Sequence, residues 1–144
     1  MPNATLSDAR KRQGELGQFF TPAPMADFMA SMFGPLPDTV RLLDAGAGAG
    51  ALTAAFVSRL CQKEDGVRII EATLFERDPF IQDALLKTMQ HCRHVCAEAG
   101  IGLTFTIHAT DFIHDMSALL TEGLFATIPP ALVDILGSGM SIDL

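Results

Sequence analysis

A glycine-rich segment between two apolar patterns constrains the fold most. Val40 to Asp44 has the composition of a buried parallel strand, and Ala51 to Leu60 is predicted to be a helix. Between them, residues 45–50 spell Ala-Gly-Ala-Gly-Ala-Gly. Because glycine has no Cβ, such a turn lets the backbone approach a ligand closely. The dinucleotide fingerprint Gly-x-Gly-x-x-Gly would place its last glycine at Ala51, where alanine is tolerated.

Strand and helix patterns alternate on both sides of this loop. Further strands are predicted over residues 67–75 and 103–108, and further helices over residues 1–20, 25–33, 79–99 and 116–120. A fourth strand is indicated for residues 131–136. The order predicts an α/β fold with a Rossmann-like, doubly wound, mostly parallel sheet. The sheet is expected to be incomplete, with three to four strands preceded by N-terminal helices.

Two helices carry apolar stripes that we assign to the core. Met25, Phe28, Met29 and Met32 fall on one side of the first of them. In the other, Asp78-Pro79 has the residue types of an N-cap and first helical position, and Gly100 is suited to end the helix. The apolar face of this second helix comprises Ile81, Leu85, Met89, Cys92 and Cys96.

The cluster His91, Cys92, His94 and Cys96 raises the question of a zinc site. On a helix, Cys92 and Cys96 share one face, whereas the histidines lie to one side, and no second ligand pair has finger-like spacing. Small buried cysteines are therefore favoured over a metal site, and we predict no metal. The chain has three cysteines, an odd number without framework spacing, which favours a reduced cytoplasm.

Composition and charge exclude several classes of protein. The sequence is 49% hydrophobic and 19% charged, which argues against disorder. A net charge of −7 argues against a self-sufficient DNA-binding protein, and the basic cluster Arg10-Lys11-Arg12 is more simply a solvated helix face. The longest uncharged run, residues 45–58, is too short to span a bilayer, and no secretory signal is evident. We expect a cytoplasmic protein with no membrane partner.

An acidic residue follows the second predicted strand. Glu76 lies one βαβ step after the glycine loop, where an acid accepts hydrogen bonds from ribose hydroxyls, and a solvated strand end is the simpler alternative. A dinucleotide would place its pyrophosphate at the helix N-terminus. S-adenosylmethionine has no phosphate and carries a cationic sulfonium, with which Asp44 is compatible. The loop alone leaves both ligands open.

The stretch upstream of the first strand resembles a known motif. Residues 17–22, Gly-Gln-Phe-Phe-Thr-Pro, are similar to the opening motif of the N6-adenine DNA methyltransferases of restriction–modification systems. A helix, the glycine loop, Glu76 and Asp111-Phe112 follow in that family's order, so the resemblance covers about residues 10–115. It implies a fold of the S-adenosylmethionine-dependent methyltransferase type, with S-adenosylmethionine as cofactor and DNA as a partner.

The resemblance implies a role for each matching residue. Thr21, with Phe20 beside it, would bond the methionine carboxylate of the cofactor, and Asp44 would lie near the methionine end. Glu76 would hold the ribose. The glycines that would let the backbone approach are Gly46, Gly48 and Gly50.

Two more residues are assigned to the adenine end of the cofactor. Asp111 would accept a hydrogen bond from the adenine amino group, and Phe112 would pack on the ring. Simpler alternatives stay open, in which Thr21-Pro22 caps the next helix and Asp111-Phe112 is a strand-end turn with a core aromatic residue.

The family's catalytic element, Asn/Asp-Pro-Pro-Tyr/Phe, has no counterpart in these 144 residues. Pro129-Pro130 is flanked by Ile128 and Ala131, so we assign no catalytic residue. The expected organisation is an N-terminal helical segment (1–38), a partial S-adenosylmethionine-binding domain (39–136) and a short tail (137–144).

We therefore interpret the chain as the cofactor-binding part of such a methyltransferase, shortened by truncation, frameshift or gene division and inactive alone. The alternative is a non-catalytic module that pairs with a separate catalytic or target-recognition chain. A third hypothesis, a small NAD-dependent reductase, rests on the loop only.

Overall fold

The computed structural model describes residues 20–62 and 66–122. Three parallel strands, β1 (Thr39–Asp44), β2 (Ile69–Phe75) and β3 (Gly102–His108), form one sheet in the order β1-β2-β3. The helices are α2 (Ala23–Ser31), α3 (Ala51–Gln62), α4 (Pro79–Glu98) and α5 (Phe112–Glu122). The prediction of an incomplete, Rossmann-like α/β sheet is confirmed for these strands. The helix predicted over residues 1–20, the strand over 131–136 and the tail over 137–144 lie outside the described residues, apart from Phe20.

Parallel pairing brings the carboxyl ends of all three strands to one edge of the sheet. Asp44 at the end of β1 is in register with Leu74, and Phe75 at the end of β2 is in register with His108. The backbone ladder continues past the strands, because Ala47 N donates to Phe75 O and Glu76 N donates to His108 O, both at 3.0 Å. The segments after the strands are therefore tied together, and the predicted site residues fall on them.

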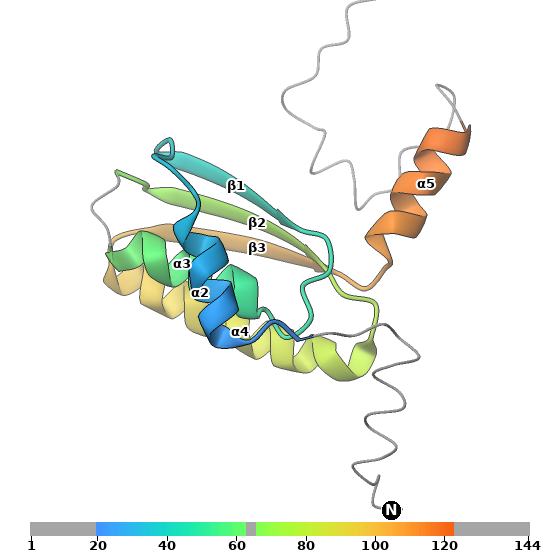
Figure 1. Cartoon of the computed structure of the whole chain (residues 1–144), viewed down its shortest axis with the longest axis horizontal. Coiled ribbons are helices and arrows are strands. Elements are labelled where there is room, and N and C mark those ends of the chain that lie inside the picture. Colours follow the sequence, from blue (N-terminus) through green and yellow to red (C-terminus); the bar gives the residue numbers. More distant parts are fainter. Residues whose placement is uncertain (1–19, 63–65, 123–144) are drawn as a thin grey trace, which may run out of the picture.

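Three helices cover one face of this sheet. Figure 1 shows α2, α3 and α4 on the same side, whereas α5 stands apart beyond the end of β3. Strand residues that face the helices alternate with exposed ones, as period-two geometry requires. The large core side chains include Leu60 of α3, Ile70 and Leu74 of β2, and Leu85 and Met89 of α4.

Helix α4 follows its sequence signals closely. Asp78 is its N-cap and accepts a hydrogen bond from Phe80 N at 2.9 Å, and Pro79 is the first helical residue. Gly100 has φ +74° just past the helix, a conformation that suits glycine. The predicted apolar face is buried from Leu85 through Cys96, and Ile81 is half-buried.

Helix α2 packs differently from the prediction. Met25, Phe28 and Met32 are exposed by 52%, 62% and 66%, so their assignment to the core is wrong. The helix instead buries Ala26 and Ala30, whose small side chains let it approach α3 closely. For that reason Met25, Phe28 and Met32 lie on the solvent-exposed side of α2, and Met29 is half-buried.

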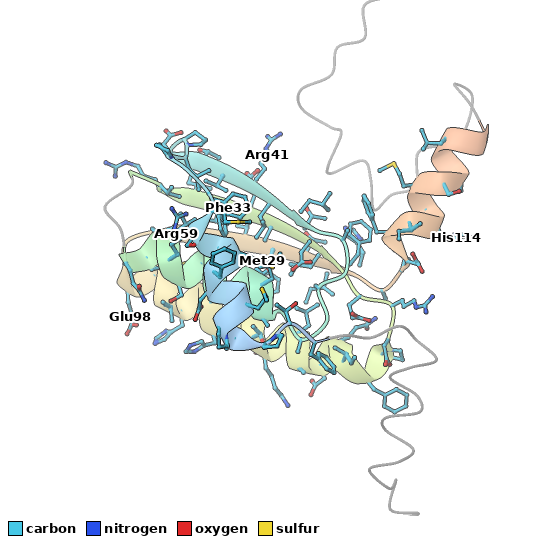
Figure 2. All side chains as sticks on the ribbon, viewed as in Figure 1. Met29, Phe33, Arg41, Arg59, Glu98 and His114 are labelled. Carbon is cyan, nitrogen blue, oxygen red and sulfur yellow. The ribbon has the colours of Figure 1, made fainter. Side chains whose placement is uncertain are left out.

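The end of α2 is held against α3 by two contacts. Arg59 of α3 donates from Nη2 to the carbonyl of Phe33 at 2.5 Å, and the Phe33 ring lies edge-on to Phe56 with centroids 4.9 Å apart. Figure 2 shows Phe33 and Arg59 next to each other. Ala30 belongs to the same core cluster as the buried side chains of α3. The boundary that the sequence predicts between an N-terminal segment (1–38) and a cofactor-binding domain (39–136) stays a prediction.

The opposite face of the sheet is largely open in the part of the chain that the structure describes. Leu43 and Ile69 are exposed on it by 42% and 44%. Arg41 and Glu71 form an ion pair there, Nε to Oε2 3.2 Å, and Figure 2 shows Arg41 on the side away from α2. Near the carboxyl ends, the rings of His108 and Phe112 cover Phe75. Among the described helices, none is long and apolar enough to cross a membrane.

Candidate functional site

The glycine loop runs from the end of β1 to the start of α3, and its three glycines have different surroundings. A Cβ at Gly46 would meet nothing within 4 Å. Gly48 has φ +53°, and a Cβ there would lie 3.8 Å from the Phe20 ring. Gly50 has φ +86°, and its Cβ would lie 2.9 Å from Leu85 Cδ1. Gly46 is therefore open to a ligand, whereas Gly50 is needed for the packing of the loop against α4.

Glu76 is buried and holds the loop. It is 9% exposed, so the alternative of a solvated strand end is wrong. Its Oε2 accepts a hydrogen bond from Gly48 N at 3.0 Å, and its Oε1 accepts one from Asp78 N at 2.8 Å. The carboxylate thus joins the end of β2 to the loop after β1, which is the position predicted for a ribose-binding acid.

Asp44 is oriented by a residue that the sequence analysis missed. Its Oδ2 accepts a hydrogen bond from the hydroxyl of Thr53, 2.7 Å away, and Thr53 is 2% exposed. Thr53 lies in the first turn of α3, where a side chain faces back toward the loop. The sequence signal that could have identified Thr53 is a hydroxyl side chain in the first turn of the helix that follows a strand ending in an acidic residue.

Phe20 and Thr21 come from the N-terminal motif and meet the glycine loop, as the resemblance implies. Together with Asp44 and the loop they line a cavity of about 70 Å³. Pockets for cofactor-sized ligands hold roughly 300–1,000 Å³, so the cavity admits only part of such a ligand. Phe20 is 52% exposed and forms one wall, which makes it the side chain best able to move aside.

The helix after the motif is capped without Thr21. Pro22 is the N-cap residue of α2, and its carbonyl accepts hydrogen bonds from Met25 N and Ala26 N. No side-chain hydrogen bond caps this helix. The alternative that Thr21-Pro22 caps the helix is therefore correct for the backbone carbonyl of Pro22 and wrong for the side chain of Thr21.

Asp111 lies at the start of α5 and both of its oxygens have partners. Oδ1 accepts hydrogen bonds from Ile113 N at 3.0 Å and His114 N at 3.2 Å, which caps the helix. Oδ2 lies 3.1 Å from Arg77 Nη1. This cap explains why α5 begins at Phe112 and not at the predicted Met116. Arg77 is a second residue that sequence reasoning missed, although it directly follows Glu76.

Phe112 is half-buried and packs against another aromatic ring. Its ring lies edge-on to Phe75 with centroids 5.1 Å apart, and Phe75 also stacks on His108. The alternative of a strand-end turn with a core aromatic residue is met in part, because Asp111 caps α5 and Phe112 packs on Phe75 but is only half-buried. Because the helix cap uses Oδ1 of Asp111, its Oδ2 is the carboxylate oxygen that the cap does not use.

The predicted site residues gather at one edge and give it an acidic character. Asp44 is the last residue of β1, Glu76 directly follows β2, and Asp111 lies between β3 and α5, where Arg77 pairs with it. The carboxylates suit a ligand that offers hydroxyl or amino donors and a positive charge. A pyrophosphate fits poorly, because the Gly48 N–H already bonds to Glu76 and anions flank the loop.

The cysteines lie away from this edge. Cys92 and Cys96 are buried on α4, as predicted, and Cys61 Sγ lies 3.7 Å from Cys96 Sγ. Burial raises the pKa of the Cys96 thiol to about 12, with a further contribution from Cys61. Within the described ranges, no group of three or more histidine, cysteine or acidic residues is arranged to hold a metal ion.

Two curated proteins share sequence with this chain. It is 38% identical over 86 residues to the type II methyltransferase M.BsuBI of Bacillus subtilis, and 31% identical over 121 residues to the type II methyltransferase M.PstI of Providencia stuartii. The chain is related to type II methyltransferases. The matches cover 59% and 83% of this chain but only 17% and 23% of those proteins. The chain thus spans about a fifth of the length of these relatives, and no family model matches it.

Proposed function

We propose that this chain binds S-adenosylmethionine at the carboxyl edge of its sheet. The observation that carries the proposal is that Asp44, Glu76 and Asp111 each lie at the carboxyl end of a different parallel strand, with Glu76 bonded to the glycine loop. In open α/β sheets, ligands bind in the crevice outside the carboxyl ends of the strands. The relation to type II methyltransferases supports a methyl donor as the ligand.

The chemistry of the edge matches the parts of this cofactor. Glu76 would accept hydrogen bonds from the ribose hydroxyls, and Asp111 would accept one from the adenine amino group. Asp44 would lie beside the cationic methionine end, where Thr21 would donate to the carboxylate. Gly46 leaves open space for the cofactor, and Phe20 would move from its place over Gly48. S-adenosylmethionine supplies an electrophilic methyl group when bound.

We further propose that this cofactor serves methylation of adenine N6 in DNA, with the chemical step carried by residues other than these 144. The sequence contains no Asn/Asp-Pro-Pro-Tyr/Phe element, and its net charge of −7 is unsuited to gripping phosphates. The second candidate is a cofactor-binding module that works with a separate catalytic chain. The acidic edge favours either one over an NAD-dependent reductase.

Titration calorimetry of the purified chain tests cofactor binding. We expect heat of binding with S-adenosylmethionine and none with NAD. Glu76→Gln should weaken binding at least about tenfold, because the amide is uncharged and offers one acceptor oxygen in place of two. Glu71→Gln is the matched control, since Glu71 is exposed on the open face of the sheet and should leave affinity unchanged.

A second variant separates binding from folding. Gly46→Val adds a side chain where nothing lies within 4 Å, so the fold should persist while the approach of the cofactor is blocked. Thermal unfolding followed by circular dichroism checks that each variant is folded. Tight binding of NAD, or equal affinity of the wild type and Gly46→Val for S-adenosylmethionine, contradicts the proposal. Transfer of labelled methyl groups to unmethylated DNA by the chain alone contradicts its catalytic part.

A further inference from the structure

Arg77 connects two parts of the site that the sequence separates. It follows Glu76 at the end of β2, and its Nη1 lies 3.1 Å from Oδ2 of Asp111, 34 residues along the chain. The side chains are 49% and 38% exposed, so the pair lies at the surface of the site. Arg77 is therefore next in sequence to the acid assigned to the ribose, and its guanidinium is paired with the acid assigned to the adenine.

The two oxygens of Asp111 have different partners. Oδ1 accepts the backbone N–H groups of Ile113 and His114, which fully uses its two lone pairs. Oδ2 accepts from Arg77 alone among these contacts, and a carboxylate oxygen can accept two hydrogen bonds. Oδ2 is consequently the atom able to receive a donor from a ligand, and Arg77 determines where its remaining lone pair points.

We propose that Arg77 is a positioning residue that makes Asp111 selective for a 6-amino purine, and this inference rests on the proposed binding of S-adenosylmethionine. The exocyclic amino group of adenine donates a hydrogen bond to Oδ2. Hypoxanthine carries an oxygen at that position, which places an acceptor against the carboxylate. With Oδ1 held by the helix cap and Oδ2 by Arg77, the carboxylate keeps one orientation. It therefore discriminates between these bases more sharply than a carboxylate held at Oδ1 alone, which can turn Oδ2 away from the mismatched oxygen.

The chain offers an ion pair of the same kind as a control. Arg41 and Glu71 are separated by 3.2 Å and are 59% and 50% exposed, on the open face of the sheet. Exposed pairs of this type contribute little to stability. Replacing either arginine by alanine changes the net charge equally, so the two variants differ in which carboxylate loses its arginine partner.

The test is a titration with two ligands, S-adenosylhomocysteine and its hypoxanthine analogue S-inosylhomocysteine. The wild type should prefer the adenine ligand, and Arg77→Ala should lower that preference about tenfold, equivalent to the loss of one oriented hydrogen bond. Arg77→Lys, which keeps one charged donor, should retain part of the preference. Arg41→Ala should behave as the wild type, and all variants should unfold at similar temperatures.

Each outcome supports or overturns the inference. A preference that survives intact in Arg77→Ala overturns it, as does an equal loss in Arg77→Ala and Arg41→Ala. If the wild type binds neither ligand, the proposed function fails and the role of Arg77 falls with it. If the wild type binds the adenine ligand and only the effect of Arg77→Ala is missing, the proposed function stands and this inference alone is removed.

Discussion

Gly46, Gly48 and Gly50 look equivalent in the sequence, but their surroundings differ. All three were assigned to the approach of a cofactor on the basis of the resemblance. The structure leaves space beside Gly46, covers Gly48 with Phe20, and packs Gly50 against Leu85 and Thr88 of α4. Positive φ favours glycine at Gly48 and Gly50, close packing adds to this at Gly50, and neither applies at Gly46.

The packing of Gly50 predicts a loss of stability on substitution that a glycine in open surroundings does not show. Gly50→Ala should lower the free energy of unfolding by about 1–3 kcal/mol, because it forces a side chain into φ +86° and against Leu85 Cδ1 at 2.9 Å. Gly34→Ala is the control, since a Cβ there meets nothing within 4 Å. Urea unfolding followed by circular dichroism measures both. Equal stability of the two variants would contradict the packing role of Gly50.

At the scale of elements, α4 and α2 show where sequence patterns succeed and fail. The start of α4 was predicted from Asp78-Pro79 and its end from Gly100, because caps depend on residues close in sequence. For α2, the Met and Phe stripe was placed in the core, yet Ala26 and Ala30 face α3. The hydrophobic pattern predicted where the helix lies in the sequence. Which of its faces packs against α3 was decided by the small side chains at the contact between the two helices.

Two substitutions in α2 test this orientation. Phe28→Ser should change the free energy of unfolding by less than about 0.5 kcal/mol, because Phe28 is 62% exposed. Ala30→Leu should cost about 1–3 kcal/mol, because Ala30 is 1% exposed and an added side chain overpacks the contact with α3. Thermal and urea unfolding provide the measurement. A larger loss for Phe28→Ser than for Ala30→Leu would restore the predicted orientation.

For the molecule as a whole, the described sheet is covered by α2, α3 and α4 on one face only (Figure 1). Parallel sheets are normally covered on both faces, and their strands are apolar for that reason. Leu43 and Ile69 are exposed on the open face, together with the Arg41–Glu71 ion pair. The predicted parallel sheet is confirmed, and within residues 20–62 and 66–122 the helices that pack on it lie on one face.

This open face predicts self-association of the purified chain. We expect the sedimentation coefficient to rise with protein concentration, because apolar side chains on an uncovered sheet favour contact with a second copy. Replacing both Leu43 and Ile69 with lysine should reduce that rise. Phe28→Lys is a control with an exposed apolar residue on the other side of the molecule. A dispersed monomer at all concentrations contradicts the prediction.

Within the described residues, the sequence by itself determined the three strands, the helices α2 to α4 and the parallel α/β class, because hydrophobic period, glycine turns and helix caps are properties of neighbouring residues. It also named Asp44, Glu76 and Asp111 as residues of one site. Only the tertiary structure decided how they are held, through Thr53 on Asp44, Gly48 on Glu76 and Arg77 on Asp111. The last two contacts join residues 28 and 34 positions apart, and such partners depend on how strands and helices come together in space.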